Sequence, residues 1–405
     1  MFQGILERAY RQFSSEHIWT YSPVVITLIV ASLAYAIVLQ MREKRAPMLR
    51  ILYCAIATLA LAFFCGLRHQ SVGTDTERYY QMIGAEFNVT LNQILDNYLP
   101  NRAENREVEE LPRDVVFYTV SDQLRLCGFS EYGVFCVYAL FYVGVAGWLV
   151  YRYSDNPIVS YFAFMALGSY MFNFTGLRQS IALGWVMLAY PYIEKRNFLF
   201  FTFFVLVGML FHKSAVIFFP AYFLCRIEVR FSRLLVLAAI VALVFYKARF
   251  VGDFIVQTFG GLDERVEGYF GEQREWERSA ASCTIRFTIL FLFYVVCMFS
   301  RGGRKNTGYI FTPEETILIN LLLIGTIFEM YSLQGWGGMT RLGLYYRAFS
   351  FLLIPKLIEE SKHYIPVPYS VTVAGFAALA SLYFMKSISI YGPYHFNWQG
   401  WVNVG

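Results

Sequence analysis

Three arginines stand at the ends of long apolar segments, and two of them lie in a repeated Gly-Leu-Arg tripeptide. They are Arg68, Arg178 and Arg341, with the tripeptide at 66–68 and 176–178. An arginine placed in the hydrocarbon of a bilayer costs roughly 2.5 to 3.5 kcal/mol on insertion scales, so arginines kept at such positions are expected to serve a purpose. A guanidinium offers planar, bidentate donors to phosphate oxygens. The pattern therefore predicts that these arginines hold an anion.

The residues after Arg68 add groups for acid–base chemistry. His69, Asp75 and Glu77 follow it within a short stretch of chain. We interpret Arg68 as a phosphate ligand and Asp75 as a general base or an acceptor-orienting carboxylate, with His69 among the substrate-binding residues. Alternatively, Arg68 only snorkels to the interface and pairs with Asp75. Asp75 and Glu77 could also hold Mg²⁺ or Mn²⁺, a hypothesis ranked second because the arginines already supply positive charge.

The second tripeptide opens an apolar segment with Arg178 and Gln179. Gly176 removes side-chain bulk at the point where a substrate or another backbone could approach. Free N–H groups at a helix N-terminus favour anions, and a guanidinium adds bidentate donors, so this position suits a diphosphate. An arginine that only anchors the helix among lipid headgroups would give a similar pattern. We predict that Arg178 is catalytic and that Gln179 binds substrate.

A polar interruption lies inside the apolar stretch 198–224. Phe211 is followed there by His212, Lys213 and Ser214, which are costly to place in lipid. We predict acid–base or ligand work for His212 and substrate binding for Lys213. A buried, hydrogen-bonded histidine at a tight turn is the competing interpretation.

Three further residues are candidates for sugar or diphosphate binding. Arg341 and Tyr345 are four residues apart, which places them on one face of a helix. Tyr394 lies in an aromatic C-terminal tail, beyond the last apolar segment. We predict that all three contact substrate.

The composition identifies the elements that must position these residues. The chain is 57% hydrophobic and only 16% charged over 405 residues, with a mean hydropathy of +0.45. Apolar stretches near the ~20 residues that cross a bilayer as a helix recur along the sequence, and barrel-type alternation is absent. We therefore predict one all-α polytopic membrane domain over residues 1–405, with extracytoplasmic amphipathic helices, one of them over 1–20. The net charge of +5 gives no reason to expect nucleic acid as a partner.

Twelve spanning helices are expected, which places both termini on one side of the membrane. Their approximate ranges are 22–40, 51–67, 130–150, 158–175, 178–193, 198–211, 214–225, 234–250, 284–299, 315–332, 342–358 and 367–385. Short basic loops alternate with the others and identify the cytoplasmic face. The opposite face then carries the candidate site and two long segments. We interpret 68–129 as short surface helices or a re-entrant element that covers a cavity, and 247–283 as a lid. An ordinary solvated loop is the alternative interpretation of both segments.

The ordered motifs resemble those of a known family. They are Arg68 with Val72-Gly73-Thr74-Asp75-Thr76 and Tyr79-Tyr80, then Leu177-Arg178-Gln179 with Ile181-Ala182, then Phe211-His212-Lys213-Ser214-Ala215. This series is similar to the EpsG-like branch of Wzy-type polysaccharide polymerases. The resemblance covers most of the chain, although after residue 245 it rests on hydropathy, Arg341 and the aromatic ending alone.

The resemblance implies an inverting, metal-independent glycosyltransferase of the integral-membrane C class in the bacterial inner membrane. Such an enzyme transfers a glycan chain from undecaprenyl diphosphate onto a hydroxyl of an incoming lipid-linked repeat unit at the periplasmic face. No cofactor is implied. The implied partners are undecaprenyl-diphosphate-linked oligosaccharide, membrane lipid and, optionally, a chain-length regulator protein. The family motifs carry over to Arg68, Arg178 and His212 with Asp75 alongside, and Arg341 is a weaker match.

Two other functions remain open at this point. A transporter or flippase for lipid-linked oligosaccharides would also have many helices and buried arginines, but its polar groups usually lie near mid-depth and not at one face. An O-antigen ligase would use the same donor with a different acceptor. Every enzymatic interpretation requires the guanidinium groups to converge in one cavity that is open to the exterior.

Overall fold

The structure is a computed structural model that describes most of the chain. The described residues are 19–41, 46–84, 115–229, 276–301, 310–332, 337–362, 364, 366–388 and 394–397. Every regular element among them is a helix, and the pairing of Arg68 with Phe396 is an isolated bridge. The chain divides into two compact units, which are described separately below. The predicted all-α class is confirmed for these residues.

Six helices are long and apolar enough to cross a membrane. They are α3 (Ser22–Met41), α4 (Ala46–Gly66), α8 (Glu131–Tyr153), the Ser282–Arg301 part of α17 (Trp276–Arg301), α18 (Pro313–Ser332) and α21 (Tyr369–Ile388). Each coincides with one of the twelve predicted segments. A multi-pass membrane protein is therefore supported.

Twelve full-length crossings are not supported, because several predicted segments are interrupted. The segment 158–175 breaks at Gly168, whose φ of +90° ends the run between α9 (Pro157–Ala166) and α10 (Ser169–Phe172). The segment 342–358 divides into α19 (Gly337–Arg347) and α20 (Ser350–Ser361). A chain that changes direction within the segment cannot cross as one helix.

The remaining predicted crossings are short or moderately apolar. The segment 214–225 forms a 3₁₀ helix, η3 (Lys213–Phe218), and a single turn, α13 (Ala221–Leu224). The helices α11 (Leu177–Glu194) and α12 (Phe198–Phe211) form, but they are not among the six candidate spans. The predicted crossing at 234–250 lies outside the described residues.

The long extramembrane segments are described in part. Two short helices, α5 (Thr76–Gly84) and α7 (Val115–Leu126), confirm the prediction of short helices within 68–129. Residues 85–114, nearly all of the predicted amphipathic helix over 1–20 and most of the predicted lid over 247–283 lie outside the described residues.

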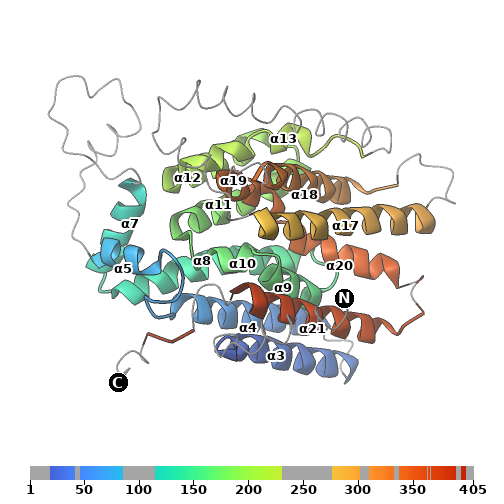
Figure 1. The fold of residues 1–405 in the computed structure, drawn as a ribbon, viewed down its shortest axis with the longest axis horizontal. Coiled ribbons are helices and arrows are strands. Elements are labelled where there is room, and N and C mark those ends of the chain that lie inside the picture. Colours follow the sequence, from blue (N-terminus) through green and yellow to red (C-terminus); the bar gives the residue numbers. More distant parts are fainter. Residues whose placement is uncertain are drawn as a thin grey trace. The chain divides into compact units, whose positions relative to one another are not determined.

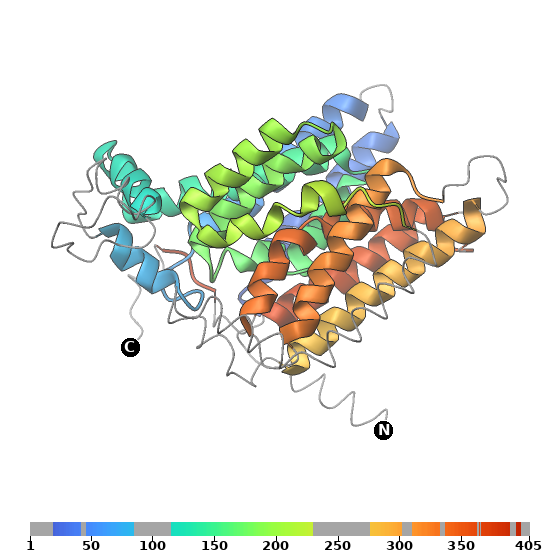
Figure 2. The same ribbon diagram turned by 90° about the horizontal axis from the view of Figure 1, so that it is seen from above.

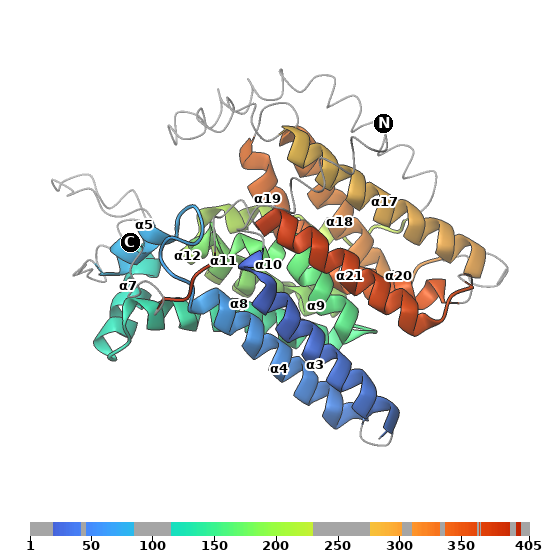
Figure 3. The same cartoon turned by 60° about the horizontal axis from the view of Figure 1, so that its bottom comes forward.

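The first unit is built from α3, α4, α8, α9 and α21, with α5 and α7 attached. The helices α3 and α4 lie side by side (Figures 1 and 3). Small residues allow α4 and α8 to pack closely: a Cβ on Gly66 would lie 2.7 Å from Cys136 Cα, and one on Gly147 would lie 2.0 Å from Thr58 Oγ1. This tight antiparallel pair fixes the end of α4, from which the chain runs directly into Arg68.

The second unit contains α17, α18, α19 and α20, coloured yellow to orange in Figure 2. A close glycine contact joins α18 to α19, where a Cβ on Gly343 would lie 2.7 Å from the carbonyl oxygen of Gly325. One turn further along α18, the Glu329 carboxylate forms ion pairs with the guanidinium groups of Arg286 and Arg347. All three charged side chains are buried, so α17, α18 and α19 share an ionic core.

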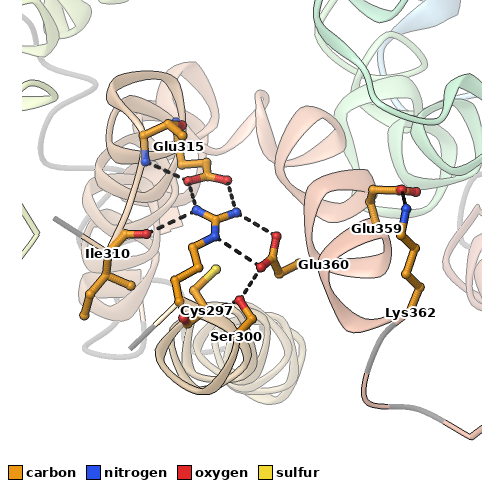
Figure 4. A network of polar contacts seen from close by, with 9 residues as sticks. Cys297, Ser300, Ile310, Glu315, Glu359, Glu360 and Lys362 are labelled. Carbon is orange, nitrogen blue, oxygen red and sulfur yellow. Dashed lines mark hydrogen bonds and ion pairs between the residues drawn. The ribbon is translucent and has the colours of Figure 1, made fainter. Parts of the chain in front are cut away.

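A second ionic cluster ties the opposite end of α17 to α18 and α20. The Arg301 guanidinium lies 2.7 Å from Glu315 Oε2 and 2.7 Å from Glu360 Oε2. Figure 4 shows the two carboxylates on opposite sides of this group, with Ser300 also contacting Glu360. Ion pairs at Arg286 and at Arg301 therefore hold α17 to its neighbouring helices in this unit.

Candidate active site

The Arg68 side chain is buried and bonded to neutral oxygen atoms. Only 2% of the residue is exposed. Its Nε donates to Thr76 Oγ1 at 3.2 Å and its Nη2 to the carbonyl oxygen of Asn173 at 3.0 Å, while Nη1 donates to the carbonyl oxygen of Cys65. Arg68 therefore joins the end of α4 to the start of α5 and to a turn 105 residues away in sequence.

Two aromatic rings complete the Arg68 pocket. The centroids of the Phe135 and Phe174 rings lie 5.2 and 5.0 Å from the guanidinium carbon. Cation–π contacts and neutral hydrogen bonds leave the positive charge in place. Within the part of the chain that the structure describes, no carboxylate binds this guanidinium, so Asp75 is not its partner.

The loop after Arg68 is seated directly on the turn before α11. Gly73 has a φ of +102°, and a Cβ there would lie 1.9 Å from the carbonyl oxygen of Phe174. Thr76 Oγ1 lies 2.6 Å from the carbonyl oxygen of Val72 and closes the loop. Only glycine fits a left-handed position pressed against another backbone, which explains the glycine in this motif.

Arg178 lies against α5, the helix that follows the loop after Arg68. It is half-buried at the start of α11, and its guanidinium carbon lies 5.5 Å from the centroid of the Tyr79 ring on α5. Each of the two arginines therefore contacts the neighbourhood of the other: Arg68 binds Asn173 in the turn before α11, and Arg178 lies against Tyr79 on α5. The neighbouring Gln179 is buried.

His212 lies at the same end of the first unit as Arg178. The helices α11 and α12 form an antiparallel hairpin in which a Cβ on Gly208 would lie 3.0 Å from the carbonyl oxygen of Ala182. Arg178 precedes Ala182 by one turn and His212 follows Gly208 by one turn, so both lie about 6 Å from the crossing in the same direction. His212 Nδ1 lies 2.6 Å from Ser214 Oγ.

The carboxylate of Asp75 lies at the N-terminus of α5. The Asp75 carbonyl oxygen accepts the Tyr79 N–H at 3.1 Å, and the side chain is half-exposed. In the described residues no hydrogen bond or ion pair holds this carboxylate, which leaves it available to accept a proton. Glu77 is exposed in the first turn of α5. Nowhere in these residues do three or more His, Cys, Asp or Glu side chains gather closely enough to hold a metal ion.

Comparison with known proteins identifies the family. Residues 51–399 match the EpsG family. The chain belongs to the EpsG family. EpsG-like proteins are members of the Wzy-type polymerase family, so a polysaccharide polymerase-type function follows at that level. No curated protein and no solved structure matches the chain.

The C-terminal tail of this EpsG-family chain pairs with the residues around Arg68. The His69 N–H donates to the carbonyl oxygen of His395 at 2.8 Å, and the Asn397 N–H donates to that of Leu67 at 3.0 Å. Tyr394 is buried, and its hydroxyl donates to the carbonyl oxygen of Phe64 at 2.7 Å. Tyr394, which we predicted to bind sugar, therefore attaches the C-terminal tail to the end of α4 in the structure.

The remaining predicted site residues differ in exposure. Lys213 is exposed and His69 is half-buried in the first unit. Arg341 and Tyr345 belong to α19 in the second unit, where Arg341 is exposed and Tyr345 is fully buried. Arg341 and Tyr345 are four residues apart, as the prediction of a shared helix face required, but one side chain is exposed and the other is buried.

Several charged and polar residues were not predicted. The Arg286–Glu329–Arg347 cluster and the Thr76 contact with Arg68 are the main examples. A signal for the cluster exists in the sequence, because Glu329 is a carboxylate inside an apolar segment and such groups require partners. No sequence signal identifies Asn173, because it binds Arg68 through its backbone.

Proposed function

We propose that this EpsG-family protein polymerises polysaccharide at the periplasmic face of the inner membrane. It transfers a glycan chain carried on a lipid diphosphate, such as undecaprenyl diphosphate, to a hydroxyl of an incoming lipid-linked repeat unit, with inversion and without a metal ion. The observation that most supports this proposal is the pair of contacts from Arg68 to Asn173 and from Arg178 to Tyr79, which brings the loop after α4, with Asp75, next to the start of α11.

In this mechanism Arg178 stabilises the leaving group. Breaking the bond between the anomeric carbon and the phosphate oxygen leaves the electron pair, and hence negative charge, on the lipid diphosphate. A fixed guanidinium at the N-terminus of α11, where the helix dipole also favours negative charge, is preorganised for that charge. Half-burial of Arg178 against Tyr79 keeps the group oriented while its outer edge reaches substrate.

Asp75 is proposed as the general base. As the acceptor oxygen bonds to the anomeric carbon, its proton passes to the Asp75 carboxylate, and the diphosphate departs from the opposite side. His212 is the second candidate for this proton transfer, oriented by its contact with Ser214. Arg68 is a positioning residue in this scheme, since its donors are occupied by Thr76 and by backbone oxygens.

A purified, reconstituted protein tests the proposal directly. Incubation with a lipid-linked repeat unit is expected to give a ladder of products that Asp75→Asn and Arg178→Ala abolish or strongly reduce. Arg226→Ala is the matched control, because Arg226 belongs to the second unit and its guanidinium packs on Tyr222. A ladder lost in a chelator would instead favour a metal ion held by Asp75 and Glu77.

The competing functions give different results in the same assay. A transporter yields no ladder in detergent, whatever the variant, and moves the lipid-linked substrate across a vesicle bilayer instead. A ligase yields one transfer to a different acceptor and no repeat series. Either outcome would overturn the polymerase proposal.

A further inference from the structure

Two neighbouring tyrosines on α5 have different surroundings. Tyr79 is buried, with its ring centroid 6.0 Å from that of Phe117 and 5.5 Å from the guanidinium carbon of Arg178. Tyr80 is the next residue of the helix, so it projects about 100° away from Tyr79 around the axis, and it is half-exposed. Tyr79 therefore holds α5 to the first unit, whereas Tyr80 contacts a different part of that unit.

The partner of Tyr80 is a tyrosine at the start of α8. The ring centroids of Tyr80 and Tyr132 are 5.0 Å apart, and the ring planes are inclined by 47°. Tyr132 is also half-exposed, and its hydroxyl is hydrogen-bonded to the backbone of Gln70 in the loop after α4. The two rings therefore form a partly exposed aromatic surface at the place where this loop, α5 and α8 meet.

This aromatic surface lies near the proposed general base. The Asp75 carbonyl oxygen accepts the Tyr79 N–H, so Asp75 lies at the start of α5. Tyr80 follows Asp75 by five residues, which is roughly 7.5 Å along the helix axis at a rise of 1.5 Å per residue. The loop that contacts Tyr132 is also the loop that carries Asp75. A short oligosaccharide with one hydroxyl at Asp75 can therefore reach the two rings.

The chemistry of this surface suits a carbohydrate. A pyranose ring has an apolar face of C–H groups that packs on an aromatic ring, and hydroxyl groups at its edge that need polar partners. Carboxylates border both rings: Glu77 is exposed three residues before Tyr80, and Glu131 precedes Tyr132 and lies 2.8 Å from Arg125 Nη2. Aromatic rings with a few polar groups around them are typical of ligand sites.

An aromatic belt at the membrane interface is the competing explanation for exposed tyrosines. Belt tyrosines place their hydroxyl groups among lipid headgroups. Here the Tyr132 hydroxyl is bonded to the protein backbone at Gln70, and the ring is paired with that of Tyr80. Tyr80 itself lies on α5, a nine-residue helix that is not among the candidate spans. These contacts favour a ligand surface over a lipid contact.

We propose that Tyr80 and Tyr132 bind a sugar of the incoming repeat unit, next to the sugar whose hydroxyl loses its proton to Asp75. This inference rests on the proposed polymerase function and adds an acceptor subsite to it. The two tyrosines orient the acceptor and take no part in the proton transfer. Because they contact the sugar and not the diphosphate, a free oligosaccharide binds here without its lipid.

Oligosaccharide binding is measured separately from catalysis. The probe is the oligosaccharide released by mild acid from the lipid-linked repeat unit of cells that make this protein, titrated by calorimetry into the full chain in detergent micelles. Tyr80→Ala and Tyr132→Ala should each raise the Kd about tenfold, a usual loss when a tyrosine anchor is truncated. Tyr80→Phe should keep the Kd near that of the wild-type protein, because the ring remains.

Tyr192→Ala is the matched control for these variants. Tyr192 is half-exposed, and its ring centroid lies 5.3 Å from that of Phe200, so it also belongs to an aromatic pair. This pair is in the second unit, away from the residues of the proposed subsite in the first. Its loss should leave the Kd for the oligosaccharide unchanged.

Initial rates of ladder formation give a second measurement. In Tyr80→Ala and Tyr132→Ala the KM for the lipid-linked unit should rise about tenfold, while kcat stays nearly unchanged because Asp75 and Arg178 remain in place. Asp75→Asn should have the opposite effect, since it lowers kcat and leaves the Kd for the free oligosaccharide unchanged. A merely structural role of the tyrosines would instead lower kcat and the Tm together.

The possible results separate this inference from the proposed function. A ladder with unchanged KM and unchanged oligosaccharide Kd in both alanine variants overturns the tyrosine subsite and leaves the polymerase proposal intact. Tyrosine-dependent binding of the oligosaccharide without any ladder supports the sugar site and overturns the polymerase. If an alanine variant folds poorly, Tyr80→Leu replaces it, because leucine keeps an apolar contact with Tyr132. Oligosaccharide binding by Tyr80→Leu as tight as by Tyr80→Phe would show that the aromatic ring is not what binds the sugar.

Discussion

Arg68 Nη2 donates to the carbonyl oxygen of Asn173 at 3.0 Å, which ties the loop after α4 to the turn before α11. Both residues are almost completely buried. The close approach of Gly73 to the Phe174 carbonyl oxygen adds a second contact between the same loop and the same turn. Arg68 is therefore a buried residue that holds these two segments together, whereas the side chain of Arg178 is partly exposed.

Arg178→Ala should reduce polymerisation by about a hundredfold to a thousandfold, the usual loss when one preorganised donor to a developing anion is removed. Arg178→Lys should recover only part of the rate, because an ammonium keeps the charge but lacks the planar pair of donors. The measurement is the initial rate of ladder formation from a defined lipid-linked repeat unit. Arg226→Ala serves as the control, and an equal loss in that variant would mean that the effect is not specific to this arginine.

Gly73→Ala should destabilise the first unit and abolish activity together. A left-handed φ costs a residue with a Cβ about 1 to 3 kcal/mol, and a Cβ here would also lie 1.9 Å from the Phe174 carbonyl oxygen, a backbone atom that cannot rotate away. Thermal unfolding and ladder formation measure the two effects.

Gly128→Ala is the matched control for that substitution. Gly128 has a φ of +91°, and a Cβ added there meets no heavy atom within 4 Å. It should therefore show the backbone strain alone and retain most of the activity. Similar losses in the two variants would show that the contact between Gly73 and Phe174 is unimportant.

The sequence predicts the six candidate spans well because each is a continuous apolar run of bilayer length. It fails at 158–175, where apolar content continues through Gly168 although the backbone there turns left-handed. The sequence placed Arg68, Arg178 and His212 on one face from the expected topology, and in the structure Arg68 and Arg178 contact neighbouring segments of the first unit. The burial of Arg68 was not predictable, because the carbonyl oxygens of Cys65 and Asn173 that accept from it are backbone atoms, which every residue type provides.

Glu329→Gln should destabilise the second unit by about 3 to 5 kcal/mol, because removing the shared carboxylate leaves two buried guanidinium groups without their counter-charge. Glu359→Gln is the control: its partner Lys362 and Glu359 itself are both more than a third exposed, so the loss should stay below about 1 kcal/mol. The free energy of unfolding in detergent micelles measures both. Equal stability of the two variants would rule out the ionic core as a major stabilising feature.

Acidification should loosen the pairing between the tail and Arg68. Burial, and then His395, lower the pKa of His69 below its ordinary value of 6.5, so the unfolded chain binds a proton more readily than the folded one. The stability of this pairing is therefore complete above the ordinary value and falls as the pH drops through the lowered one. Hydrogen exchange of the Asn397 N–H, corrected for its intrinsic pH dependence, should show less protection at about pH 5.5 than at about pH 7.5.

His69→Gln should remove that pH dependence while the backbone bond from Asn397 to Leu67 remains, because the side chain no longer titrates. His363→Gln is the matched control and should behave like the wild-type protein. A pH-dependent loss of protection that persists unchanged in His69→Gln would assign the effect to another group. In that case the titration of His69 would not control the pairing of the C-terminal tail with the loop that carries Arg68.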